Sequence, residues 1–152
     1  FVLELEGTLH TVSGSDIMNR EEDLRKKIKR LSFCDAGKSR PIPGQWRQYS
    51  VVITTFCADS ATSSKKIWRK YMKNILSLVA PNGTILLSAL RKSSFYTIGN
   101  NHFPSAKIAE KDIKNSFLKN GFLMKNIHIE IATTQGRKSK GFTSLIFARA
   151  KK

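Results

Sequence analysis

Polar side chains able to hydrogen-bond a ligand stand at the ends of three apolar runs in the sequence. They are found in Asp35-Ala36, Thr54-Thr55-Phe56-Cys57 and Ser88-Ala89-Leu90. If the runs are parallel strands of one sheet, these residues meet at its carboxyl edge, where open α/β sheets bind their ligands. An Asp at such a strand end more often caps a turn, and a carboxylate that accepts a hydrogen bond from a nucleotide amine is the sharper alternative.

The segment after the third run contains aromatic and serine side chains that could line a pocket. Residues 88–105 read SALRKSSFYTIGNNHFPS, with paired serines, adjacent aromatics and a Gly-Asn-Asn turn directly after an apolar run. A solvent-exposed connector has no use for Phe95, Tyr96 and Phe103. These side chains either anchor the loop on the protein core, which is the commoner case, or wall a ligand pocket in which the serines supply directional hydrogen bonds.

The sequence contains no motif for a metal site, a nucleophilic serine or a dinucleotide-binding loop. His10, His102 and His128 are scattered without metal-ligand spacing, and neither a G-x-S-x-G nor a G-x-G-x-x-G pattern is present. Cys34 and Cys57 are too few for a disulfide scaffold, and their apolar neighbours predict reduced, buried thiols. The candidate site therefore depends on the three strand ends.

Helices that alternate with apolar strands must position these strand ends. The run VVITTF is mostly β-branched, which is typical of a strand covered on both faces. The alternation predicts an α/β fold with an open, mostly parallel sheet, and two closing strands joined by a polar loop predict an antiparallel edge. The predicted helices span about 17–29, 63–79 and 107–120, and the predicted strands 31–36, 51–56, 84–90, 122–132 and 141–150, with a loop at 37–48 and a tight turn at 81–83.

Length and charge set the class of protein. The chain has 152 residues, of which 40% are hydrophobic, and this suits a single α/β domain over residues 1–152. No apolar stretch reaches the roughly 20 residues of a membrane span and no signal-peptide pattern is present, so a cytoplasmic protein is expected. The net charge of +16 suggests attraction to nucleic acid, acidic membranes or an acidic partner, although two basic runs fall on predicted helices, whose polar faces are normally solvated.

Several segments occur in an order and spacing similar to those of a known enzyme family. They are FVLELEG, EEDLRKKIKRL, FCDAGKSRPI, VVITTFCADSA, LVAPNGTILLSAL, SALRKSSFYTIG followed by HFPS, and GFTSLIFARAKK. Over nearly its whole length the chain resembles the small-amine methyltransferases that include nicotinamide, phenylethanolamine and indolethylamine N-methyltransferases. The resemblance implies a Rossmann-like class I methyltransferase fold, S-adenosyl-L-methionine as cofactor, and an enzyme that methylates a small-molecule acceptor, with N-methylation as the expected reaction.

The resemblance also implies roles for individual residues. The Asp35 carboxylate would accept a hydrogen bond from the cofactor's adenine amine. No side chain is expected to act as a chemical catalyst, because the sulfonium already activates the methyl group and positioning alone can lower the barrier by roughly 7–11 kcal/mol. The implied cofactor-binding residues are Asp35, Ala36, Thr54, Thr55 and Phe56, and the implied acceptor-binding residues are Ser88, Ala89, Ser93, Tyr96 and Ser105.

Two departures from the family pattern shape these expectations. Nicotinamide-methylating members carry Asp where Ser88 stands, and amine-methylating members have acidic residues close to where Arg91 and Lys92 stand. A cationic amine would meet like charges, each contact costing about 4 kcal/mol at intermediate dielectric, so a neutral or anionic acceptor is expected. The family's glycine-rich cofactor loop and ribose-binding acid would lie upstream of Phe1, so the chain is expected to be the C-terminal portion of a methyltransferase-like domain, without its first two strands.

The alternative is a protein of a different class. A catalytically inactive, methyltransferase-like basic module could keep the fold and bind nucleic acid or a protein partner through its Lys and Arg runs. A steep loss of nucleic-acid affinity with added salt would favour that alternative, and binding of the cofactor would favour the enzyme.

Overall fold

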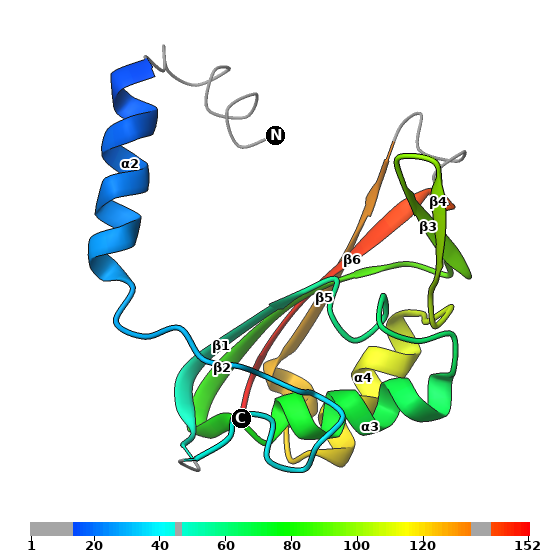
Figure 1. The fold of residues 1–152 in the computed structure, drawn as a ribbon. Helices are drawn as coiled ribbons and strands as arrows, with labels where there is room; N and C mark the ends of the chain where they lie inside the picture. Colours follow the sequence, from blue (N-terminus) through cyan, green and yellow to red (C-terminus); the bar gives the residue numbers. More distant parts are fainter. Residues whose placement is uncertain (1–13, 45–46, 135–140) are drawn as a thin grey trace. The chain divides into compact units, whose positions relative to one another are not determined.

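The computed structural model describes residues 14–44, 47–134 and 141–152 (Figure 1). The chain divides into two compact units, Phe1–Phe33 and Cys34–Lys152. In the first unit, α2 (Gly14–Lys27) confirms the helix predicted over residues 17–29. The segment FVLELEG and the basic run at 136–140 lie outside the described residues.

A four-stranded sheet organises the second unit (Figure 1). Its strands are β1 (Tyr49–Thr55), β2 (Val79–Leu90), β5 (Ile127–Thr133) and β6 (Ser144–Lys151), in the spatial order β1-β2-β6-β5. Strands β1 and β2 are parallel, whereas β6 pairs with both β2 and β5 in antiparallel fashion. The α/β class and the antiparallel C-terminal edge are thus confirmed, and among the described strands the parallel arrangement is confined to the pair β1–β2.

Helices α3 (Lys65–Leu76) and α4 (Glu110–Lys119) cover one face of this sheet (Figure 1). Alternate residues of each strand point toward them, as the period of two along a strand requires. The core so formed is closely packed: Trp68, Met72, Ile113 and Phe117 from the helices and Ile85, Leu87, Ala89, Ile146, Ala148 and Ala150 from the strands are all buried.

Polar contacts fix where the two helices begin. The Ser64 hydroxyl accepts a hydrogen bond from the Ile67 N–H (3.4 Å) and so caps α3. At the start of α4, Asp112 Oδ2 accepts one from the Ala109 N–H (2.9 Å). The same oxygen receives the Lys65 ammonium (2.8 Å), so one carboxylate ties the first turns of both helices together.

The strand predicted at residues 31–36 is wrong, because the structure has no strand there. A strand requires a neighbour for its backbone groups, and β1 is the edge of the sheet among the described residues. Cys34 and Cys57 are free, but both are exposed rather than buried, since neither lies inside a paired strand.

Two local features differ from the predicted loop and turn. Residues 81–83 form a bulge within β2 instead of separating two elements: the pairing jumps from Tyr49↔Val79 to Val51↔Thr84, and Asn82 adopts φ 61°. The segment after β2 contains a β-hairpin, β3 (Phe95–Ile98) and β4 (Asn101–Pro104), where an irregular loop was expected.

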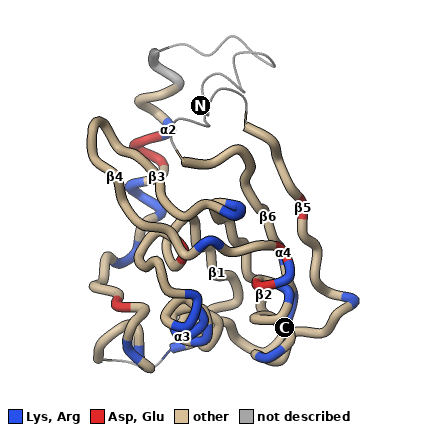
Figure 2. The backbone as a smooth tube through the Cα atoms, turned by 90° about the vertical axis from the view of Figure 1, so that its right-hand side faces the viewer, with Lys and Arg blue, Asp and Glu red and all other residues tan. Residues whose placement is uncertain are grey.

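Charge and hydropathy of the described elements add two observations. Lys and Arg residues are spread over several elements, including α3 and the C-terminal end (Figure 2). None of the described helices has the length and hydropathy needed to cross a membrane.

Candidate functional site

The carboxyl ends of β1 and β2 lie side by side. Thr55 pairs with Ser88 in the parallel ladder, and the Phe56 N–H extends it by donating to the Ser88 carbonyl (2.9 Å). Thr54 is half-buried and Thr55 is exposed, whereas Ser88 and Ala89 are buried. Two of the three strand ends singled out from the sequence therefore form one edge.

Phe56 sits at this edge in an uncommon backbone conformation. Its φ of 49° lies in the left-handed region, which costs a bulky residue of order 1–3 kcal/mol. The hydrogen bond to Ser88 holds it there, and its side chain is 39% exposed. Strained residues of this kind occur preferentially at ligand sites.

Asp35 and Ala36 form a turn that α3 anchors. Asp35 Oδ1 accepts a hydrogen bond from the Gly37 N–H (2.8 Å), so Asp35 is a turn cap, the commoner of the two roles considered for it. Asn74 on α3 donates its side-chain amide to the Ala36 carbonyl (2.8 Å) and is only 6% exposed. Sequence reasoning missed Asn74, although an amide among the apolar residues of a helix was the available signal.

The Asp35 turn and the end of β1 are close enough to interact electrostatically. Partial burial raises the pKa of the Cys34 thiol, and neighbouring Cys57 raises it further. Partial burial likewise raises the pKa of Cys57, and the neighbouring carboxylate of Asp59 raises it further. Cys34, next to the Asp35 turn, thus lies within electrostatic range of Cys57, two residues beyond β1. The third strand end belongs to a turn and not to a strand.

Asp59 joins three segments at this edge and was also missed by sequence reasoning. Its Oδ2 accepts the Leu90 N–H at the end of β2 (2.8 Å), and its carbonyl accepts the Ala106 N–H (3.0 Å). The residue is 2% exposed, and this burial raises the pKa of its carboxyl, an effect that the Leu90 hydrogen bond partly opposes. Burying a carboxyl group that has no ion-pair partner within the described residues costs free energy. The hydrogen bonds of Asp59 to Leu90 and Ala106 offset this cost and hold the three segments together.

Backbone hydrogen bonds close the base of the hairpin segment. Lys92 N–H donates to the Ile108 carbonyl (2.7 Å) and Lys107 N–H donates to the Ser93 carbonyl (2.8 Å), with both lysines at positive φ. The Ser93 hydroxyl lies within hydrogen-bond reach of the Phe95 and Gly141 carbonyls, the latter at 2.6 Å. The segment is therefore a rooted hairpin with fixed ends.

The aromatic side chains of the hairpin largely cover one another. Tyr96 stacks on Phe103 across the strands with ring centroids 5.3 Å apart, and Phe95 lies against His102 at 5.4 Å. The Tyr96 hydroxyl donates to the Ser60 carbonyl (3.3 Å), which connects the hairpin to the loop after β1. These contacts favour the anchoring role over the pocket-wall role for the aromatic pair.

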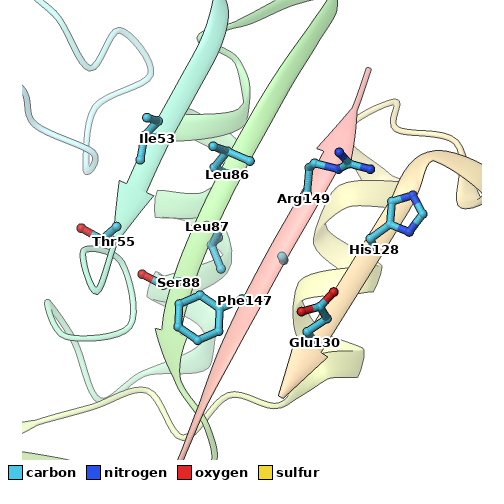
Figure 3. A pocket seen from close by; sticks show the side chains of 10 residues that line it. Ile53, Thr55, Leu86, Leu87, Ser88, His128, Glu130, Phe147 and Arg149 are labelled. Carbon is cyan, nitrogen blue, oxygen red and sulfur yellow. The ribbon is translucent and has the colours of Figure 1, made fainter. Parts of the chain in front are cut away.

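A pocket of about 590 Å³ opens on the sheet face opposite the helices (Figure 3). Thr55 and Ser88 stand at its end near the strand termini, and Glu130 and Arg149 stand on β5 and β6. This pocket brings together one predicted cofactor residue and one predicted acceptor residue. It does not include Ser93, Tyr96 or Ser105; its lining is Ile53, Thr55, Leu86, Leu87, Ser88, His128, Glu130, Phe147, Ala148 and Arg149.

Several solved structures with a similar fold are methyltransferases. The 1,6-didemethyltoxoflavin-N1-methyltransferase of Burkholderia thailandensis is similar with a TM-score of 0.56 at 12% identity, covering 92% of this chain and 58% of that one. A S-adenosylmethionine-dependent methyltransferase from Clostridium acetobutylicum gives 0.52 at 12% identity, with 91% and 72% covered. The fold is that of the class I S-adenosylmethionine-dependent methyltransferases.

Sequence comparison places the chain more narrowly. Residues 1–152 match the NNMT/PNMT/TEMT family, and the chain belongs to that family, as the resemblance of its motifs implied. Nicotinamide N-methyltransferase of Sus scrofa is 28% identical over 130 residues, or 85% of this chain and 47% of that protein. Indolethylamine N-methyltransferase of Oryctolagus cuniculus is 27% identical over 123 residues, or 80% and 45%. The chain spans about half the length of these curated relatives.

Proposed function

We propose that this chain is the C-terminal portion of a methyltransferase domain that transfers the methyl group of S-adenosyl-L-methionine to a nitrogen atom of a small molecule. The observation that supports this most directly is the shared edge at which β1 and β2 end, with Thr55 beside Ser88 and the Asp35 turn nearby. Relatives in the same family are named as N-methyltransferases of nicotinamide and indolethylamine.

The uncovered face of the sheet supports the proposal that the domain has a further part. Ile53 is 67% exposed, Val51 54% and Phe147 43%, all on strands of the central sheet. Apolar side chains that are exposed together on one face mark a surface that another part of a protein normally covers. The relatives are about twice as long as this chain, so we assign the cover of this face to the rest of the domain.

The strand ends fit one part of the proposed cofactor. Asp35 uses Oδ1 for the Gly37 N–H, and its second carboxylate oxygen is suited to accept from an adenine amine. Ala36 would lie along the ring edge, and Thr54, Thr55 and Phe56 would line the methionine part. When bound, the cofactor supplies an activated methyl group. The ribose contacts are assigned to the rest of the domain.

Among the proposed acceptor-binding residues, hydroxyl groups divide into two kinds. Ser105 Oγ is buried and has no hydrogen-bond partner within the described residues, so it is suited to a polar atom of a ligand. Ser93 and Tyr96 use their hydroxyls on backbone carbonyls. We therefore assign the Ser105 hydroxyl to direct acceptor contact and the hydroxyls of Ser93 and Tyr96 to anchoring the hairpin segment. Acceptor contacts by Ser88 and Ala89, at the end of β2, remain part of the proposal.

The chemistry at the end of β2 suits a neutral or anionic acceptor. Ser88 supplies no carboxylate, and the two following charged residues are Arg91 and Lys92. We also propose a cytoplasmic location, because the free thiols of Cys34 and Cys57 suit a reducing compartment.

Calorimetry of S-adenosylhomocysteine with the intact protein tests the proposed function. A saturable heat is expected for the wild type. Asp35→Asn keeps an oxygen for the Gly37 N–H but turns an amide donor toward the adenine amine, so affinity should fall at least about tenfold. Asp23→Asn, on α2, is the charge-matched control. No heat with the wild type would contradict the enzyme, and unchanged affinity in Asp35→Asn would contradict the role of Asp35.

A further inference from the structure

A second, smaller pocket lies just beyond the carboxyl end of β2. It has a volume of about 140 Å³ and is lined by Arg91, Lys92, Gly141, Phe142, Thr143 and Ser144. At ~30 Å³ per water molecule, this space holds roughly four or five waters. It is therefore large enough for one carboxylate or phosphate group.

The position of this pocket connects it with the proposed acceptor site. Strand β6 runs antiparallel to β2, with Leu145 opposite Leu90, so the start of β6 lies at the end of β2. Arg91 N–H continues the pairing by donating to the Ser144 carbonyl (3.0 Å). The Ser93 hydroxyl reaches the Gly141 carbonyl (2.6 Å), which joins the pocket to the base of the hairpin.

Charge in this pocket is positive on balance. Arg91 Nε binds Glu110 Oε1 at 2.6 Å, and a guanidinium has further N–H donors besides Nε. The exposed Lys92 side chain has no ion-pair partner within the described residues. The Glu110 pKa is held low first by its own backbone N–H and then by Arg91 and Lys92, so this carboxylate remains ionised beside both cations.

The ion pair with Glu110 does not explain why two cations, Arg91 and Lys92, lie at this pocket. Both side chains are 27% exposed, and ion pairs that remain in contact with water contribute little to stability. Lys92 is held at φ 52° by its hydrogen bond to the Ile108 carbonyl, which fixes the point from which its side chain starts. The exposed Thr143 adds a hydroxyl to the same lining.

We propose that this pocket binds an anionic group of the methyl acceptor, a carboxylate or a phosphate, through Arg91, Lys92 and Thr143. The inference rests on the proposed function and deepens it, because it names the class of acceptor: a small nitrogen compound with an anionic substituent. The anion competes with Glu110 for Arg91 and meets Lys92 directly. These residues determine specificity and take no part in the transfer of the methyl group.

Two compounds that differ in one group test this proposal on the intact protein. Pyridine-3-carboxylate and pyridine-3-carboxamide have the same ring nitrogen, and only the first carries an anion. With S-adenosylhomocysteine saturating, calorimetry should show the carboxylate binding about tenfold more tightly, since a hydrogen bond to a charged group is worth that factor or more. With S-adenosylmethionine, kcat/KM should favour the carboxylate in the same direction, mainly through KM.

Three variants separate this pocket from a general effect of positive charge. Lys92→Gln should remove most of the preference for the carboxylate, whereas Glu110→Gln should increase it, because the competing carboxylate is gone. Lys66→Gln changes the net charge by the same amount as Lys92→Gln but lies exposed on α3, so it should leave the preference unchanged. Opposite shifts in the Lys92 and Glu110 variants are not expected from a purely structural role.

Failure of this inference is distinguishable from failure of the proposed function. If S-adenosylhomocysteine binds and both pyridines bind equally, the proposed function stands and the anion pocket is rejected. Equal ratios in the wild type and in Lys92→Gln reject it as well. Binding of the carboxylate without methyl transfer overturns its assignment to the acceptor, and if inorganic phosphate binds the pocket without competing with either pyridine, the site is not an acceptor subsite. No binding of S-adenosylhomocysteine counts against the proposed function itself, and the carboxylate titration then still decides whether the pocket binds an anion.

Discussion

The two faces of the central sheet have similar apolar side chains and opposite surroundings. On the helix-covered face, Ile85, Ile146 and Ala150 are 0% exposed. On the open face, Leu86 is 38% exposed and Phe147 43%, although each is a direct chain neighbour of a fully buried residue. The sequence pattern of a strand predicts that both faces are apolar, but it does not say which polypeptide covers each face.

This difference shows which face of the sheet contributes to the free energy of unfolding of this chain. Burial of apolar surface contributes about 25 cal/mol per Å² removed from water, so the helix-covered face supplies it and the open face does not. The open face gains its contribution only when something packs on it. The predictions below test that division, beginning with the largest expected effect.

Neighbouring residues of β6 provide the most direct test. Ile146→Ala should destabilise the chain by about 2–5 kcal/mol, because it leaves a cavity in a closely packed core. Phe147→Ala, one residue further along, should cost less than about 1 kcal/mol, since its ring is partly in water. Urea unfolding of both variants measures the difference.

The same pair also tests the cover proposed for the open face. In the intact domain, the cost of Phe147→Ala should rise to the range of about 3–5 kcal/mol that is typical of buried aromatic residues. Equal costs for the two variants in this chain alone would break the comparison between the faces. An unchanged, small cost for Phe147→Ala in the intact domain would reject the assigned cover.

Two glycines sharpen the comparison at the carboxyl edge, where the covered face ends. At Gly141, with φ 94°, a Cβ atom would clash with the Phe95 carbonyl oxygen, so Gly141→Ala must displace the hairpin. At Gly99, with φ 58°, a Cβ atom would meet nothing within 4 Å, and Gly99→Ala should cost only the backbone term of about 1–2 kcal/mol. The free energy of unfolding and the rate of proteolysis in the hairpin should both change more in Gly141→Ala. Similar effects in the two variants would show that the hairpin is not held against the start of β6.

Two carboxyl groups, Asp59 at the carboxyl edge and Asp112 at the start of α4, should respond to pH in opposite directions. Burial raises the pKa of Asp59 above its ordinary 3.8, so its contribution to stability is complete below 3.8 and is lost as the pH rises through the folded-state value. Burial alone would raise the pKa of Asp112 too, but hydrogen bonds from Lys65 and Ala109 lower it below 3.8. The stability from Asp112 is therefore present above 3.8 and is lost as the pH falls through the lowered folded-state value.

Asparagine substitutions reveal these opposite signs. Asp59→Asn keeps an acceptor for the Leu90 N–H, so relative to the wild type this variant should become more stable as the pH rises from below 3.8 to neutral. Asp112→Asn loses the Lys65 ion pair and should become relatively less stable over the same range. Urea midpoints at several pH values measure both. Parallel pH profiles would contradict the different environments of the two carboxyls.

The parts of the fold that could be predicted are those determined by local pattern. Strand β1 follows from a β-branched run, and α4 follows from apolar residues at helical spacing that end at Asn120-Gly121. The strand at 31–36 was predicted from the same kind of pattern and is wrong, because strand formation also needs a distant neighbour. The hairpin β3–β4 was missed because its strands are four residues each and are stabilised by cross-strand ring pairs.

For the site, the sequence was informative where a general rule of sheet topology brings distant residues together, and uninformative where a single long-range side-chain hydrogen bond does so. Thr55 and Ser88 could be expected together because parallel strands end at one edge. The amide of Asn74 among apolar helix residues was a signal, but the partners of Asp59 and Asn74 could not be predicted, since Leu90 and Ala36 are 31 and 38 positions away. The proposed binding roles of Asp35, Ser88 and Ser105 remain predictions for the experiments above.

The smallest expected effect concerns nucleic acid. The open face carries Arg149 on β6, but Glu130 and the apolar Phe147 line the same pocket, an arrangement that suits phosphate poorly (Figure 3). Other cations are spread over several elements (Figure 2).

Each phosphate contact changes the slope of log K against log salt by about 0.9, so Arg149→Gln should change the slope for duplex DNA by much less than that amount. Fluorescence anisotropy at several salt concentrations measures the slope. A steep wild-type slope that falls by a full contact in Arg149→Gln would identify the open face as a nucleic-acid surface, and it would favour the inactive basic module over the methyltransferase.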